Sequence, residues 1–125
     1  MSDRQPWAPE DLDAKADIDP ATFFAVDMRV GVVTEVEEFP EARNPAWKLT
    51  VDFGPVIGVR RTSAQVTNYA RDDLVGRKVV GALNLGAKRI AGFRSEFLVL
   101  GSMDPDGLVR LLRVEDDPPL GAAIA

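Results

Sequence analysis

The alternation of apolar and polar residues predicts a chain built mainly of β-strands. In residues 47–53 (WKLTVDF) the odd-numbered positions are apolar and the even-numbered positions are polar, which is the pattern of a half-buried antiparallel strand. Residues 28–39 (MRVGVVTEVEEF) are β-branched and largely alternate. They predict a long first strand with a bend or bulge at Gly31.

Turn signals divide the rest of the chain into short elements. Gly54-Pro55 predicts a tight turn into a third strand at residues 56–61, residues 68–75 (NYARDDLV) allow one helical turn, and Gly76 is a natural stop. Residues 79–85 and 97–103 are apolar enough to be the fourth and fifth strands. The turn signal at 104–107 (DPDG) predicts that residues 108–113 pair back as a terminal strand, followed by an extended tail over 120–125.

The predicted order of elements indicates an all-β fold, a five-stranded Greek-key OB-fold barrel with one short helix between strands 3 and 4 and with N- and C-terminal extensions. An SH3-like barrel or a split sandwich would show similar turn signals, but the helix between the third and fourth strands favours the OB type. We expect residues 1–18 to form an acidic arm, mobile or loosely docked, and residues 19–125 to form one domain.

The segment before the first strand carries two adjacent aromatic side chains. Asp19 and Pro20 predict the start of a short helix, with an acidic N-cap and a proline at the first helical position. Phe23 and Phe24 follow in that helix. The two rings are predicted to anchor the helix to the core. Alternatively, since both cannot face inward from one short helix, they cover a second subunit.

Charge is distributed unevenly along the chain. The net charge is −5, yet residues 55–95 contain eight cations and two anions. This basic block is a candidate contact face for an anionic partner, while the acidic remainder would repel nucleic acid from other sides. The eight cations are Arg60, Arg61, Arg71, Arg77, Lys78, Lys88, Arg89 and Arg94.

The composition argues against catalysis. The chain has neither cysteine nor histidine, so disulfides, thiolate metal sites and the usual general base are excluded. No Gly-rich phosphate loop and no nucleophile elbow is present. We therefore predict a protein that is not an enzyme and needs no metal or cofactor.

No apolar run is long enough to span a membrane and the first residues do not resemble an export signal, so we expect a cytoplasmic protein.

The loop between the fourth and fifth strands is the most informative stretch. It carries Lys88, Arg89 and Arg94 and contains Gly86 and Gly92, which indicates either a contact surface or ordinary solvated charges. Phe93, flanked by Gly92 and Arg94, is the best candidate for an exposed ring. Together with Leu85 and Ile90 it could line a shallow apolar pocket; alternatively, Ile90 and Phe93 only pin the loop to the barrel.

Three runs carry a family resemblance: residues 26–54 (VDMRVGVVTEVEEFPEARNPAWKLTVDFG), 58–67 (GVRRTSAQVT) and 79–101 (VVGALNLGAKRIAGFRSEFLVLG). They resemble the tRNA-binding OB domain that is appended to methionyl- and phenylalanyl-tRNA synthetases and also occurs as free-standing proteins. Within that superfamily the chain is most similar to the small export-related chaperones of the CsaA type. The resemblance covers roughly residues 23–125. The short length, without a synthetase catalytic domain, favours the free-standing form.

The resemblance implies a homodimer with two roles, namely holding unfolded or presecretory polypeptides and binding tRNA without reading its sequence. It implies dimer contacts around Phe23 and Phe24 and in the C-terminal extension. The chain departs from many members at residues 85–87 (LGA), where those members have an aromatic residue and prolines. The polar residues that match the superfamily's motif positions are Ser63, Gln65, Asn84, Lys88, Ser95 and Glu96.

The residues and the resemblance together predict one peptide- or tRNA-binding site. We rank polypeptide binding first because of the CsaA resemblance and the acidic balance, and structure-dependent tRNA binding through a basic face second. The predicted site consists of Arg60, Arg61, Ser63, Gln65, Asn84, Lys88, Arg89, Phe93, Arg94, Ser95 and Glu96.

Overall fold

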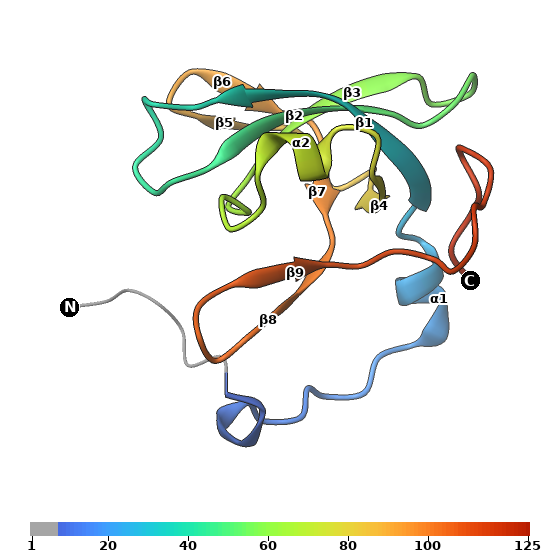
Figure 1. Ribbon diagram of the computed structural model, residues 1–125. Helices are drawn as coiled ribbons and strands as arrows, with labels where there is room; N and C mark the ends of the chain where they lie inside the picture. Colours follow the sequence, from blue (N-terminus) through green and yellow to red (C-terminus); the bar gives the residue numbers. More distant parts are fainter. Residues whose placement is uncertain (1–7) are drawn as a thin grey trace.

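The long strand β1 (Met28–Glu38) joins the two halves of a curved five-stranded sheet. The computed structural model describes residues 8–125 (Figure 1). The C-terminal half of β1 pairs with β2, and its N-terminal half pairs with β4. The sheet has the order β3-β2-β1-β4-β7 with every pair antiparallel, where the other strands are β2 (Trp47–Asp52), β3 (Val59–Ala64), β4 (Lys78–Ala82) and β7 (Leu98–Val99).

The interior of the curved sheet is filled by the apolar positions of the alternating strands. Leu49, Val51 and Phe53 are at most 1% exposed, as the alternation in residues 47–53 predicts. The Phe53 ring meets the Phe97 ring edge to face, with 5.0 Å between their centroids. This aromatic pair lies in the hydrophobic core that the whole barrel shares.

Of the bend or bulge predicted at Gly31, the bulge is not found there. The register of β1 against β2 shifts between Val33 and Glu35 instead. Gly31 is needed for packing, because a Cβ atom there would lie 2.7 Å from the Phe53 ring. Gly81 on the neighbouring strand has the same role, since its Cβ would lie 2.8 Å from Cζ of Phe53.

The predicted third and fifth strands differ from the observed ones. β3 begins at Val59, because a wider turn in which the Gly58 N–H donates to the Gly54 carbonyl (2.7 Å) precedes it. The predicted strand at 97–103 is two strands: β7 pairs with β4, whereas β8 (Gly101–Met103) pairs with β9 (Val109–Leu111) in a hairpin that leaves the barrel sheet (Figure 1).

The predicted helix after the third strand is observed as α2 (Arg71–Leu74), between β3 and β4. A second hairpin, β5 (Lys88–Ile90) with β6 (Phe93–Ser95), occupies the connection between β4 and β7. The predicted C-terminal tail is not free: the Val30 N–H donates to the Ala122 carbonyl (3.0 Å), and Arg29 forms a β-bridge with Ala123.

Helix α1 (Pro20–Phe24) begins as predicted. The Asp19 side chain accepts a hydrogen bond from the Ala21 N–H (3.1 Å), and Pro20 occupies the first turn. Phe23 and Phe24 are 43% and 66% exposed and contact each other edge to face.

The acidic segment 1–18 lies partly outside the described residues, because the structure describes it only from residue 8. Residues 8–18 contain the short 3-10 helix η1 (Pro9–Asp11) and are mostly exposed. No helix within residues 8–125 is both long and apolar enough to cross a membrane.

Candidate binding site

The β5–β6 hairpin has two faces that carry different side chains. Cross-strand partners share a face in an antiparallel pair, so the pairs Lys88–Ser95 and Ile90–Phe93 lie on one face and the pair Arg89–Arg94 lies on the other. The connecting turn has positive φ at Ala91 (47°) and Gly92 (83°), as a two-residue type I′ turn requires.

Ser95 and Glu96 attach the hairpin to β3. The Ser95 hydroxyl lies 3.0 Å from the Thr62 hydroxyl, and both side chains are buried. The Glu96 N–H donates to the Arg61 carbonyl (2.8 Å), while the Glu96 carboxylate accepts the Arg61 N–H (2.9 Å). These two predicted site residues therefore position the hairpin in this structure, and a ligand contact for them stays a prediction.

Phe93 packs against the outer face of the sheet. Its ring meets Phe39 at 5.5 Å between centroids, and Lys48 Nζ and Arg61 Cζ lie 5.3 Å and 4.9 Å from its centre. These cations stabilise the ring through its π-face. The ring that the sequence predicts to be exposed is thus partly buried, and Phe39, Lys48 and Arg61 contact it.

The sequence reasoning missed Phe39 and Lys48. Phe39 directly follows β1, and Lys48 lies on β2, where it pairs with Glu37 across the strands. Lys48 Nζ also lies 4.8 Å from the Phe39 ring centre. The alternation of residues 35, 37 and 39 could have placed Phe39 on the same face as Glu37, although nothing local shows that the hairpin covers it.

The pair Arg89 and Arg94 forms the basic part of the hairpin. Both side chains are exposed on the face that turns away from Ser95. Arg89 donates to the Gly92 carbonyl (3.1 Å), and Arg94 Nε lies 4.0 Å from the Glu96 carboxylate. Like charges placed directly opposite each other repel, so this pair would be stabilised by an anion bound between the two guanidinium groups.

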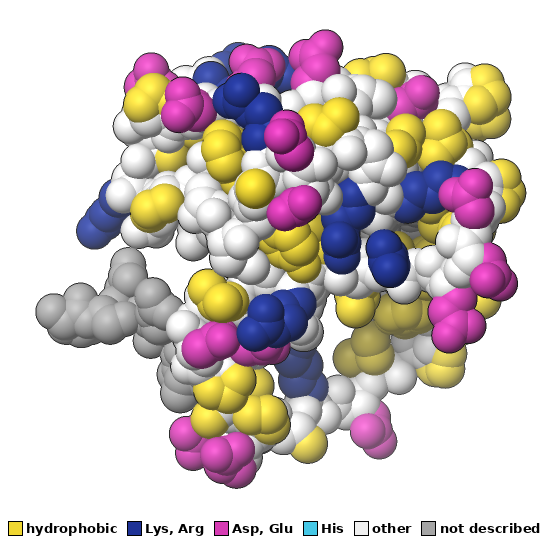
Figure 2. All heavy atoms as spheres, in the orientation of Figure 1, with side chains coloured by type: hydrophobic (Ala, Val, Ile, Leu, Met, Phe, Trp, Pro, Cys, Tyr) yellow, Lys and Arg dark blue, Asp and Glu magenta, His cyan; other side chains and the backbone are white. Residues whose placement is uncertain are grey.

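The basic block of the sequence is not one basic surface. Arg60 and Arg61 point to opposite faces of β3, since side chains alternate along a strand, and Arg61 pairs with Glu37 at 2.9 Å. Lys78 pairs with Asp117 at 2.6 Å. Figure 2 shows basic and acidic side chains interspersed over the visible face.

Asn84 connects the end of β4 to the segment after α1. Its side-chain oxygen accepts the Asp27 N–H and its amide group donates to the Ala25 carbonyl, each at 2.8 Å. The amide thus holds the segment that carries Phe23 and Phe24, and a ligand role for Asn84 stays a prediction.

A groove of about 510 Å³ lies between the hairpin and β3, which we call the hairpin groove. Leu85, Ile90 and Leu98 supply apolar surface, and Lys88 and Ser63 supply polar groups. Phe93 is not part of its lining, because that ring packs on Phe39.

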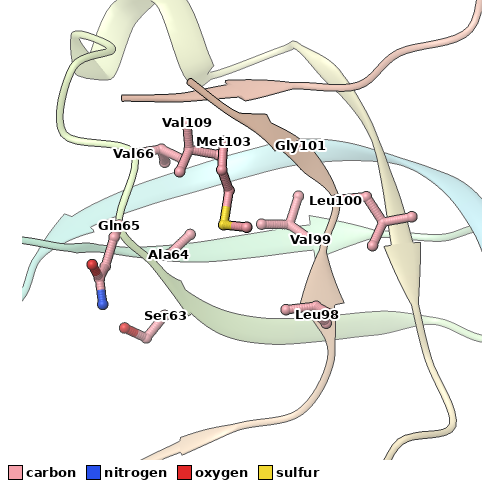
Figure 3. Close-up of a pocket in the computed structure, with 10 residues that line it drawn as sticks. All are labelled: Ser63, Ala64, Gln65, Val66, Leu98, Val99, Leu100, Gly101, Met103 and Val109. Carbon is pink, nitrogen blue, oxygen red and sulfur yellow. The ribbon is translucent and has the colours of Figure 1, made fainter. Parts of the chain in front are cut away.

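A second groove of about 370 Å³, which we call the seam groove, shares Ser63 and Leu98 with the hairpin groove. Figure 3 shows the residues that line it. Gln65, an exposed predicted site residue, lies on its wall together with Val99 and Met103.

Within residues 8–125 no group of three or more acidic side chains is arranged to hold a metal ion.

The barrel and the hairpin on its outer face match a known family. The sequence model of the family described as "Putative tRNA binding domain" matches residues 28–123. The chain belongs to this family. The motif resemblance over β1–β3 and the hairpin is thereby confirmed.

Two similar solved structures support the OB-type barrel. The CsaA chaperone protein from Picrophilus torridus is 43% identical, with a TM-score of 0.83, and the match covers 87% of this chain and 100% of that one. The CsaA chaperone from Bacillus anthracis gives the same identity and TM-score over 88% of this chain and 100% of that one.

Methionine–tRNA ligases are also similar to this chain. The methionine–tRNA ligase of Methanocaldococcus jannaschii is 35% identical over 100 residues, which is 79% of this chain. The chain spans only about 15% of the length of that enzyme.

Proposed function

We propose that this protein is a non-catalytic, cytoplasmic, homodimeric chaperone-like protein that binds unfolded or presecretory polypeptides. The observation that carries the proposal is the pair of adjacent, largely apolar grooves that share Ser63 and Leu98. The likeness to two CsaA chaperones over their whole lengths supports it.

The hairpin groove has the chemistry that an unfolded chain needs. Leu85 is 57% exposed and Leu98 is 53% exposed, so both present apolar surface that a client side chain can cover. Ser63 and Lys88 at the same groove can bind main-chain groups of the client. A shallow groove of this kind binds weakly, and two copies on one dimer would raise the affinity for a long client through effective concentration.

The exposed aromatic pair supports dimerisation. Phe23 and Phe24, together with Leu112 (49% exposed) and Val114 (41% exposed), leave large apolar side chains uncovered. Replacing Phe23 and Phe24 by serine should give a monomer or an aggregate, which light scattering measures as mass. A dimer of unchanged mass would contradict this interface.

Binding of tRNA is the second candidate, and the exposed Arg89–Arg94 pair favours it. Two guanidinium groups side by side suit phosphate. Base stacking is disfavoured because the Phe39 and Phe93 rings already contact each other and Lys48. An RNA partner would therefore be recognised through its shape and phosphates.

One titration separates the two functions. Purified protein is titrated against labelled tRNA and against a reduced, alkylated unfolded protein at several salt concentrations. Apolar polypeptide binding should change little with salt, whereas log K for tRNA should fall linearly with log salt concentration. If the unfolded protein does not bind below about millimolar Kd, the proposed function is wrong.

A further inference from the structure

The strand that runs from β7 into β8 has one open edge. The Leu100 N–H donates to the Val80 carbonyl on β4 (2.9 Å), and the Leu100 carbonyl accepts the Leu112 N–H that follows β9 (3.1 Å). Both neighbours therefore lie on the same side of this strand. Backbone groups alternate in direction along a strand, so those of Val99, Gly101 and Met103 point to the other side. Within the described chain no backbone partner pairs with them there.

β3 has an open edge that faces the same space. The Arg61 backbone bonds to Glu96 on the side away from β2, so the alternation directs the backbones of Ser63 and Gln65 to that side as well. The Ser63 N–H reaches only the Ser95 hydroxyl at 3.3 Å. In residues 8–125 no backbone hydrogen bond of Gln65 is found.

The two edges are joined at one end and separate toward the other. At the joined end the Thr62 hydroxyl donates to the Phe97 carbonyl at 2.7 Å. Beyond it lies the seam groove, whose lining includes Gln65 on one edge and Val99, Gly101 and Met103 on the other. In Figure 3 the Met103 side chain reaches between Val99 and Ala64. A methionine, 52% exposed here, is a flexible apolar cover that can adapt to different side chains.

We propose that the seam groove binds a short extended apolar peptide segment, which adds as a strand to the open edge at residues 99–103. The unpaired backbone N–H and C=O groups of Val99, Gly101 and Met103 repeat at every second residue. An extended peptide backbone can hydrogen-bond to all of them, whereas a compact ligand cannot. The apolar walls take every second side chain of that peptide. The inference rests on the proposed polypeptide-binding function and specifies how the client is held.

The test uses a fluorescein-labelled nonapeptide of alternating valine and threonine with a lysine at each end. Two further versions carry backbone N-methyl groups on all valines or on all threonines, and fluorescence anisotropy measures each Kd. N-methylation removes donors without changing side chains, so at least one version should bind about tenfold or more weakly than the parent peptide. Equal affinity of all three peptides would overturn strand addition.

Protein variants locate the site. Met103→Lys should weaken the parent peptide about tenfold, because a charge would enter the apolar groove. Val56→Lys is the matched control, since Val56 is 82% exposed in the turn before β3. This variant should bind the parent peptide with wild-type affinity. Thermal unfolding checks that both variants fold. In amide NMR spectra the peptide should shift Val99, Gly101 and Met103.

The outcomes separate this inference from the proposed function. If Leu85→Lys abolishes binding of the unfolded protein and Met103→Lys does not, the seam proposal is wrong and the proposed function stands. If Met103→Lys dissociates a dimer without affecting peptide affinity, a second copy occupies the groove and the proposal is overturned. If neither the peptide nor the unfolded protein binds, both ideas fail.

Discussion

Replacing Asn84 by alanine should destabilise the protein and loosen the segment that follows α1. The side chain makes two hydrogen bonds of 2.8 Å, to the Asp27 N–H and the Ala25 carbonyl. Each such bond contributes roughly 0.5–1.5 kcal/mol. Because the side chain is exposed and water can replace part of the interaction, we expect a loss of about 1–2 kcal/mol for the pair.

Urea unfolding at fixed protein concentration measures this loss. With a slope of roughly 2 kcal/mol/M, the midpoint should fall by about 0.5–1 M. Asn68→Ala is the matched control, because that exposed asparagine makes one hydrogen bond, to the Val109 carbonyl at 3.2 Å. Its effect should be at most half as large.

Hydrogen exchange at Asp27 and light scattering complete the test. The Asp27 amide should lose its protection in Asn84→Ala, and the dimer should dissociate at a higher protein concentration if Phe23 and Phe24 lie between subunits. An unchanged urea midpoint, or a lowered midpoint with full protection of the Asp27 amide, would refute the reasoning.

Three further changes test the core, the basic pair and the attachment of the hairpin. Gly81→Val should cost about 1–3 kcal/mol in urea unfolding, because the new side chain overlaps the Phe53 ring; wild-type stability would contradict this packing. The double change Arg89→Gln and Arg94→Gln should lower the log–log salt slope of tRNA binding by about 2 and leave thermal stability unaltered; an unchanged slope would remove the pair from the RNA contact. Thr62→Val should cost about 1–3 kcal/mol, since the Ser95 hydroxyl and the Phe97 carbonyl lose their hydrogen bonds to Thr62, with exchange at the hairpin amides rising first; a neutral effect would show that the Thr62 hydroxyl does not hold the hairpin.

The sequence predicts those elements whose pattern is local. The alternation of residues 47–53 specified both the strand and the face that Leu49 and Val51 bury, because a strand reverses its side chains at every residue. The start of α1 could be predicted for the same reason, since Asp19 caps the helix and Pro20 occupies its first turn, both within a few residues of sequence. Such signals need no knowledge of what packs against the element.

Features that depend on distant partners could not be predicted. The strand pattern predicts a bend or bulge at Gly31, but it does not show that Phe53, 22 residues later, requires a residue without a side chain there. The run at 97–103 is apolar except for Ser102, and its composition does not show that the strand changes partner from β4 to β9 at Leu100. Asn84 was placed at the ligand site, whereas its hydrogen-bond partners come from the segment before β1.

The open edge at residues 99–103 is bounded in a way that limits self-association. An unpaired strand edge is a template for aggregation, which natural proteins restrict with charges and prolines. Here the edge ends at once in the turn at Asp104 and Pro105, where the Asp104 N–H already donates to the Leu108 carbonyl (2.9 Å). The edge can therefore pair with only a few residues of another chain. So short a pairing is a weak template for edge-to-edge aggregation.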